Sequence, residues 1–156
     1  MPQLSLQSPF GELTLFEEDG AIVALEWGRA GEQSSTALLS RAAVILQDYF
    51  DTGLLSEALP LNPAGTPYQR AVWKALQAIP AGQTRTYREI AAQAGGSARS
   101  VGNANSRNPI PILIPCHRVV AAQGLGGYSG AEGLATKRAL LALEGVSLDR
   151  WSPGII

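Results

Sequence analysis

The sequence predicts an α/β domain over residues 1–60, built from a three-stranded antiparallel sheet and one helix, followed by a mostly α-helical domain over residues 66–150. Two observations predict this order. Apolar and polar residues alternate through the first 27 residues, as they do in half-buried strands. After residue 66 the apolar spacing becomes helical, and capping signals mark several helix starts. The segment Leu55–Gly65 lies between the two patterns and is interpreted as a linker.

Three short alternating segments account for the predicted sheet. Turn signals at Ser8–Gly11 and Asp19–Gly20 separate them, which favours an antiparallel meander. The alternating apolar residues are Leu4, Leu6, Leu13, Leu15, Val23, Leu25 and Trp27.

One helix is expected after the sheet, with Ser35 as its N-cap and Gly53 at its end. It should cover one face of the sheet. Nothing in this half of the chain suggests chemistry, so the first domain is interpreted as mainly structural. The apolar positions of the helix are Leu38, Ala42, Ile45 and Tyr49.

The second domain is expected to begin with a helix capped by Thr66, with Pro67 in its first turn and Gln69 in the capping-box position. A second capping box, Thr86 with Glu89, predicts another helix. The apolar stripe of the first of these helices is Val72, Trp73, Leu76 and Ile79.

Gly95–Gly96 ends the second of these helices, and Ser97 can cap the next one. Two short helices joined by a tight glycine turn are typical of a helix-turn-helix, a pattern that also occurs in plain helical bundles. We expect a winged-helix-like form of this motif.

The helix that begins at Ala98 is nearly free of large side chains, whereas a helix that reads bases in the major groove needs long ones. Small residues would let it enter the minor groove, which is only about 6 Å wide. Arg99 alone is long enough to reach into the base stack. An alternative is a helix packed against a neighbour through its small residues. The residues expected at the DNA surface are Ala98, Arg99, Ser100, Gly102 and Asn103.

Charge divides the 156-residue chain sharply, although its net charge is only −1. Residues 1–65 carry two arginines against nine carboxylates, a net −7, and residues 66–156 carry ten cations against four carboxylates, a net +6. A polyanion would choose the second half, unless these charges are simply scattered and solvated. The chain lacks a signal peptide and a membrane-length apolar run, so a cytoplasmic location is expected. A single cysteine and a single histidine cannot supply a usual zinc site.

Asn108–Val119 contains that cysteine and that histidine, as the neighbours Cys116 and His117. Its three prolines argue against a central strand and favour a stiff, extended, buried segment that holds a thiol in a dry pocket. A buried core cysteine is the plain alternative. The adjacent His117 and Arg118 favour a nucleophile, because nearby cations lower the pKa of a thiol.

Two later features belong with this segment. The glycine-rich loop Gly124–Gly130 carries Tyr128 and Ser129 and could close over a flat ligand. The last helix, Leu134–Leu143, is followed by Glu144, a carboxylate at the negative end of a helix. Glu144 is either tolerated at the surface or is a strengthened proton acceptor that orients His117.

Together, Asn108-Pro109, the run PILIPCHRV, Tyr128-Ser129-Gly130 and Leu143-Glu144-Gly145 resemble the O6-alkylguanine-DNA alkyltransferase family. The resemblance covers residues 67–145, and the first domain is similar to the ribonuclease-H-like leading domain of that family. It implies direct repair, in which the cysteine takes an alkyl group from O6 of guanine and keeps it; whether O4 of thymine is also a substrate is left open by the sequence. The target base must first be flipped out of the duplex.

The resemblance also implies a role for each matching residue. Cys116 is the acceptor, His117 is its base through a bound water, Glu144 holds the histidine and Asn108 braces the turn. Tyr87 displaces the base and protonates the leaving guanine, and Arg99 is the finger that fills the gap. Neighbours on an extended chain point to opposite sides, which independently suggests a water between Cys116 and His117. The expected guanine pocket is Tyr128, Ser129, Lys137 and the backbone of Val119.

A monomer that acts on double-stranded DNA containing O6-alkylguanine, without cofactor or metal, is therefore expected. Some members bind zinc in the leading domain, but the ligands are absent here. The segment from Ser129 to Lys137 is longer than in many members. Two alternatives are a binding-only relative, against which Cys116 argues, and a thiol hydrolase that would turn over repeatedly.

Overall fold

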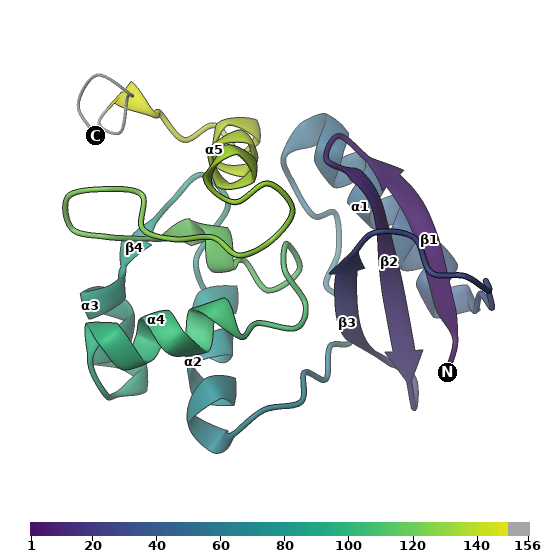
Figure 1. The fold of residues 1–156 in the computed structure, drawn as a ribbon, viewed down its shortest axis with the longest axis horizontal. Coiled ribbons are helices and arrows are strands. Elements are labelled where there is room, and N and C mark those ends of the chain that lie inside the picture. The colour runs from purple at the N-terminus through teal and green to yellow at the C-terminus, as the bar shows by residue number, and fades with distance from the viewer. Residues whose placement is uncertain (150–156) are drawn as a thin grey trace.

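The computed structural model describes residues 1–149 and places the sheet and the helical half side by side (Figure 1). Arg150, the last residue of the predicted second domain, lies outside the described residues. The predicted order of an α/β first half and an α-rich second half is confirmed. Buried apolar residues from both halves pack into one cluster. The domain boundary between residues 60 and 66 stays a prediction.

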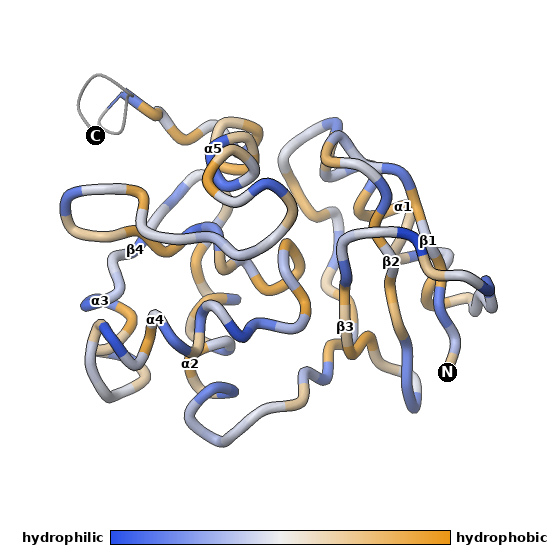
Figure 2. Tube along the Cα trace, in the orientation of Figure 1, coloured by the Kyte–Doolittle hydropathy of each residue, from blue (hydrophilic) through white to orange (hydrophobic). Residues whose placement is uncertain are grey.

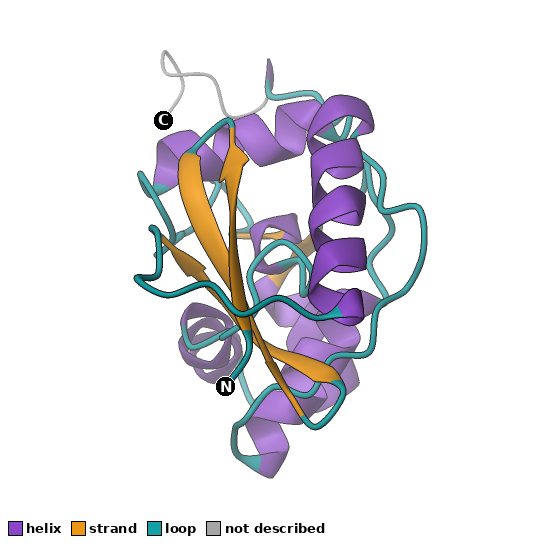
Figure 3. Ribbon diagram, turned by 90° about the vertical axis from the view of Figure 1, so that its right-hand side faces the viewer, coloured by secondary structure: helices purple, strands orange, loops and turns teal. Residues whose placement is uncertain are grey.

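The antiparallel meander is confirmed, as β1 (Gln3–Ser8), β2 (Gly11–Glu18) and β3 (Ala21–Trp27) pair in that order. Helix α1 (Ala37–Thr52) packs against β1 and β2 (Figure 3). Gly53 ends α1 with φ +80°, as expected, but Ser35 is not its N-cap. The Thr36 hydroxyl instead accepts from Leu39 N, because the helix begins one residue later than expected.

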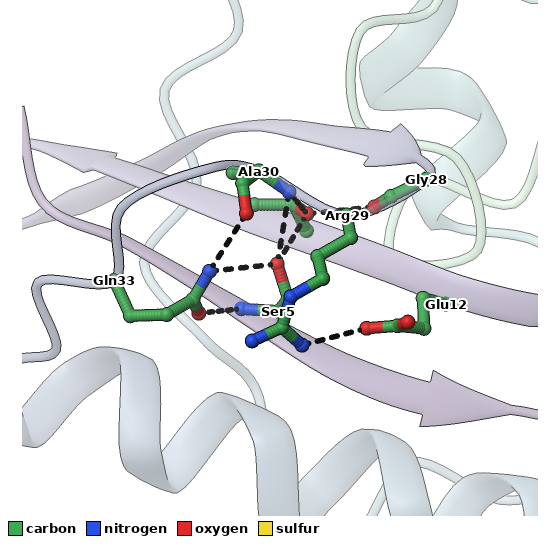
Figure 4. A network of polar contacts seen from close by, with 7 residues as sticks. Ser5, Glu12, Gly28, Arg29, Ala30 and Gln33 are labelled. Carbon is green, nitrogen blue, oxygen red and sulfur yellow. Dashed lines mark hydrogen bonds and ion pairs between the residues drawn. The ribbon is translucent and has the colours of Figure 1, made fainter.

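Polar contacts fix the loop after β3 across the sheet (Figure 4). The amide of Ala30 donates to the hydroxyls of Ser5 and Thr14, each at 3.1 Å, and the Gln33 side chain contacts Ser5 at its amide and hydroxyl. Thr14 also donates to the carbonyl of Gly28 at 2.7 Å. Because Trp27 directly precedes Gly28, this network holds the end of β3 that reaches the site described below.

Three helix starts of the second half follow the capping signals, whereas α5 (Leu134–Leu143) begins after Gly133 without a side-chain cap. Both predicted capping boxes form, at Thr66 for α2 (Pro67–Gln77) and at Thr86 for α3 (Tyr87–Ala94), and Ser97 caps α4 (Ala98–Ser106). The glycine pair between α3 and α4 has positive φ at both residues, which allows the tight helix-turn-helix connection. Helix α5 (Leu134–Leu143) ends at Glu144–Gly145 as expected.

The edge of β3 connects the two halves. The amide of Leu25 donates to the carbonyl of Pro109 at 2.9 Å, and Ile22 pairs with the segment around Leu61. Two very short strands, β4 (Arg85–Thr86) and β5 (Val119–Val120), pair in parallel on the other side of the cysteine segment. Figure 2 shows hydrophobic colour along the chain between α4 and β5. None of the helices within residues 1–149 is both long enough and apolar enough to cross a membrane.

Candidate active site

Asn108 organises the turn that leads to the cysteine. Its side-chain oxygen accepts from the amide of Ile110 at 3.0 Å, and its side-chain nitrogen donates to the carbonyl of Ile114 at 2.8 Å. Ile112 has φ +73°, so the chain reverses between these contacts. The expected extended segment is therefore wrong, because the buried polar groups are satisfied by turns that Asn108 closes rather than by a straight chain.

Cys116 begins a single turn of 3-10 helix, η1 (Cys116–Arg118). Neighbouring side chains in such a helix are about 120° apart, so the opposite-sides argument drawn from an extended chain does not apply. Cys116 and His117 nevertheless leave η1 in different directions. The side-chain amide of Asn105 on α4 donates to the carbonyl of Cys116 at 3.2 Å, which ties this turn to the helix-turn-helix.

The thiol lies between two cavities. The first, of 230 Å³, is bounded by Tyr87, Gly102 and the loop from Gly127 to Ser129. The second, of 320 Å³, is bounded by β3 and by the turn that Asn108 braces. The residues that line both cavities are Asn105, Cys116, Tyr128 and Ser129.

Cys116 is buried, with 6% of its surface exposed, and burial raises the pKa of its thiol. The side chain of Asn108 and the charge of Lys137 act in the opposite direction without overcoming burial. The expectation that Arg118 would help to lower this pKa is wrong, because its guanidinium is committed to Glu144 and to the carbonyl of Ile79. The resting thiol is protonated at neutral pH and requires a base.

Glu144 accepts hydrogen bonds from both residues that follow the cysteine. His117 Nε2 lies 2.7 Å from Glu144 Oε2, and Arg118 donates through Nε at 2.8 Å and through a terminal nitrogen at 2.9 Å. The side chains of His117 and Glu144 are fully buried. A carboxylate accepts only, so Nε2 carries the proton, and Nδ1 has no hydrogen-bond partner among the described residues.

The electrostatics of this group favour a neutral histidine beside a charged carboxylate. Burial is the largest influence on the pKa of His117 and lowers it; the hydrogen bond and charge of Glu144 raise it, Arg118 and Lys137 lower it, and the net shift is downward. Burial acts to raise the pKa of Glu144, but hydrogen bonds from His117, Arg118 and Tyr49 outweigh it and bring the pKa to about 2. The expectation that a helix C-terminus would make Glu144 a stronger proton acceptor is therefore wrong.

Lys137 is fully buried and does not itself line the first cavity, although it contacts Gly127, which does. Its ammonium donates to the carbonyl of Val119 at 2.6 Å and to that of Gly127 at 3.0 Å. Burial lowers the pKa of Lys137 to about 8. Lys137 thus connects β5 to the glycine-rich loop.

The aromatic residues expected at the pocket line it. Burial raises the pKa of both Tyr87 and Tyr128. The Tyr87 hydroxyl accepts from the amide of Gly127 at 3.3 Å, whereas the buried hydroxyl of Tyr128 has no partner within residues 1–149. The Ser129 hydroxyl donates to the carbonyl of Ser106 across the cavity mouth at 3.4 Å.

Helix α4 packs against its neighbours through part of its small residues and leaves others exposed. One face is buried through Val101, Ala104 and Asn105, while Gly102 lines the first cavity opposite Tyr87. The Ser100 hydroxyl contacts that of Tyr68 at 2.8 Å. The exposed residues of the helix include Ala98, Arg99 and Asn103.

Two residues of this site, Asn105 and Tyr49, escaped the sequence reasoning, and so did the role of Arg118 as a partner of Glu144. Arg118 stands next to the Cys-His pair, so its position gave a signal. For Asn105 the only signal in the sequence was its position on the helix α4. Tyr49 had none, because its helical spacing indicates a core residue and its hydroxyl reaches Glu144 from 95 positions away.

A buried thiol at a cavity wall, backed by a histidine and a carboxylate and adjoining a helix-turn-helix, defines a thiol-dependent enzyme with a nucleophilic cysteine. The sequence profile of the 6-O-methylguanine DNA methyltransferase DNA-binding domain matches residues 67–146. The chain belongs to the methylated-DNA–protein-cysteine methyltransferase family.

The relatives match over nearly the whole chain. The methyltransferase of Mycolicibacterium paratuberculosis is 44% identical over 90% of each chain. The constitutive one of Bacillus subtilis is 39% identical over 90% of this chain and 93% of its own. The crystal structure of Mycobacterium tuberculosis OGT in complex with DNA has a TM-score of 0.82 at 39% identity, covering 98% of this chain and 96% of that one.

Proposed function

We propose that this protein repairs double-stranded DNA by moving the alkyl group from O6 of guanine to the sulfur of Cys116 in a single turnover. The observation that carries the proposal is the position of Cys116, whose thiol lies at a cavity wall with a buried histidine–carboxylate pair beside it. A thioether formed there has no leaving group that water could displace, so each molecule acts once. Family membership supports the alkyl transfer itself.

Binding precedes the chemistry. Helix α4 presents small side chains and the exposed Arg99, a combination that suits the narrow minor groove. Arg99 takes the place of the flipped nucleotide, and the base enters the 230 Å³ cavity. Flipping costs a few kcal/mol, and least for a weakly paired damaged base, so selectivity begins before the chemical step.

The thiol proton moves through a water to Nδ1 of His117, whose other nitrogen is held by Glu144. The thiolate attacks the alkyl carbon, forming the S–C bond as the C–O6 bond breaks. The electron pair passes to guanine, which takes a proton from Tyr87, and Tyr87 is reprotonated from solvent or from His117.

The pocket orients the base through the residues around Lys137. A carbonyl oxygen has two lone pairs, so Val119 can accept from guanine while it accepts from Lys137. Ser129 and Tyr128 supply the opposite wall. Asn108 keeps the cysteine turn in shape, and Ala98, Ser100, Gly102 and Asn103 form the DNA surface around Arg99.

The helix-turn-helix acts as a winged-helix-like unit, and the first half corresponds to a ribonuclease-H-like leading domain. The protein works as a monomer without a cofactor, since acceptor, base and proton donor all come from one chain. A cytoplasmic location suits its unpaired cysteine, because the cytosol keeps thiols reduced.

The test is intact-protein mass spectrometry after incubation with a duplex that contains O6-methylguanine. The expected result is one added methyl group per molecule, located on Cys116, with no further product from excess substrate. Tight binding without a mass change would indicate a binding-only protein. Repeated release of product would indicate a thiol hydrolase.

A further inference from the structure

Tyr49 connects the first half of the chain to the catalytic carboxylate. It lies in the last turn of α1 and is fully buried, and its hydroxyl donates to Glu144 Oε2 at 2.5 Å. This oxygen is the same one that contacts His117. Arg118 also donates to this oxygen at 2.9 Å, so two donors from the second half share it with one donor, Tyr49, from the first half.

The contact is built into the packing of two helix ends. Gly53, one turn after Tyr49, lies so close to the end of α5 that an added Cβ would be 2.3 Å from the carbonyl of Leu143. With φ +80° as well, Gly53 occupies a position that favours glycine on both counts. The C-terminal end of α1 is thereby held against the residue that precedes Glu144.

A hydrogen bond to a carboxylate withdraws charge from the oxygen that accepts it. Hydrogen bonding to the charged form stabilises that form, so Tyr49 makes Glu144 a weaker acceptor for any other proton. His117 depends on this acceptor, because Glu144 is the group that favours its imidazolium. The other charged groups that face His117 are the cations Arg118 and Lys137, which oppose it.

We propose that Tyr49 is a positioning residue that limits the proton affinity of His117 by sharing Glu144 Oε2. The inference rests on the proposed function, in which His117 must be neutral at rest to accept the thiol proton. If Glu144 gave more of its charge to His117, the proton affinity of the ring would rise, and in a larger fraction of molecules Nδ1 would already carry a proton. The hydroxyl of Tyr49 keeps Nδ1 available.

If Tyr49 served only the stability of the fold, a different result would be expected. Loss of its hydroxyl would then lower stability, and the protonation of His117 would not change. Because His117 is the only histidine of the chain, its ring resonances in an NMR spectrum need no assignment. Its titration can therefore be followed directly, whether or not the protein reacts.

The experiment is an NMR titration of His117 in the wild type and in Tyr49→Phe. The pKa of His117 is expected to rise by roughly half to one unit in Tyr49→Phe. The lower limb of the pH–rate profile with free O6-benzylguanine should move to higher pH in parallel. Tyr68→Phe is the matched control, since its hydroxyl contacts Gly95 and Ser100 and no group near His117.

Replacement of all four tyrosines by 3-fluorotyrosine covers the case in which Tyr49→Phe does not fold. A fluorinated phenol is a stronger donor, so the pKa of His117 should then fall. An unchanged pKa in the variants that fold would overturn the inference. If alkyl transfer proceeds while that pKa is unchanged, the proposed function stands alone. If the pKa of His117 shifts but the protein never gains an alkyl group, the role of Tyr49 is supported and the proposed alkyl transfer is wrong.

Discussion

The two halves of the chain contribute to the site in different ways. The second half carries the thiol, the histidine, the carboxylate and the walls of the first cavity, and it holds the net positive charge. The first half carries a net −7 and supplies one hydroxyl, from Tyr49, and one cavity wall, from β3. The reacting groups thus come from the second half, while the burial and hydrogen bonds that set their protonation depend on both halves.

Cys116→Ser should have the largest effect, because it removes the acceptor while leaving both halves intact. Alkyl transfer should be abolished, since a serine hydroxyl is a far weaker nucleophile than a thiolate. Binding to duplex DNA should remain near the wild-type level, because it depends on cations spread over the second half. Mass spectrometry and a fluorescence binding assay check the two outcomes, and an equal loss of both would contradict the separation.

Glu144→Gln tests the residue at which the halves meet. Removing one partner of a buried ion pair typically costs about 3–5 kcal/mol, here because Arg118 would stay buried without its carboxylate. For a chain of this size each kcal/mol lowers the melting temperature by about 2–4 °C. Glu132→Gln, at an exposed position, is the control and should melt like the wild type.

The stability that Glu144 contributes should also depend on pH in a defined direction. Its folded pKa of about 2 lies below the unfolded value of roughly 4.3, so the contribution is complete above the unfolded pKa. It is lost as the pH falls through the folded pKa. Denaturant titrations should show that the difference in the free energy of unfolding between the wild type and Glu144→Gln shrinks as the pH falls from about 4.5. A difference that stays constant over this range would contradict this account.

Arg99→Ala should separate DNA handling from chemistry within the second half. The free base needs no flipping, so reaction with O6-benzylguanine should keep the wild-type rate. Repair of the duplex should slow by about ten- to a hundredfold, the equivalent of the few kcal/mol that flipping costs. Single-turnover kinetics on both substrates measure this, and a matched loss would mean that Arg99 supports the fold instead.

The smallest effect should come from alkylation itself. An added carbon in a packed site costs about 1–3 kcal/mol, and the cavities on both sides of Cys116 favour the lower figure. The methylated protein should therefore melt about 2–4 °C below the unmodified one. A thermal scan after full alkylation, with DNA removed, decides it. An unchanged midpoint would show that the cavities absorb the methyl group.

The sequence by itself determined the features that depend on neighbouring residues. The helix starts at Thr66, Thr86 and Ser97 follow from caps that satisfy amide groups within three residues. The meander follows from alternation with a period of two. Cys116, His117 and Glu144 could be singled out because a cysteine–histidine pair and a carboxylate at a helix end each break a local pattern.

Only the tertiary structure decided how those groups behave. The turn-rich path from Asn108 to Cys116, the protonated thiol, and the low pKa of Glu144 depend on burial and on donors distant in sequence. Tyr49 is the clearest case, since its apolar spacing predicted the burial of its ring but not the partner of its hydroxyl. Desolvation and hydrogen bonding act through space, so the proton state of a buried site is fixed only when the two halves pack together.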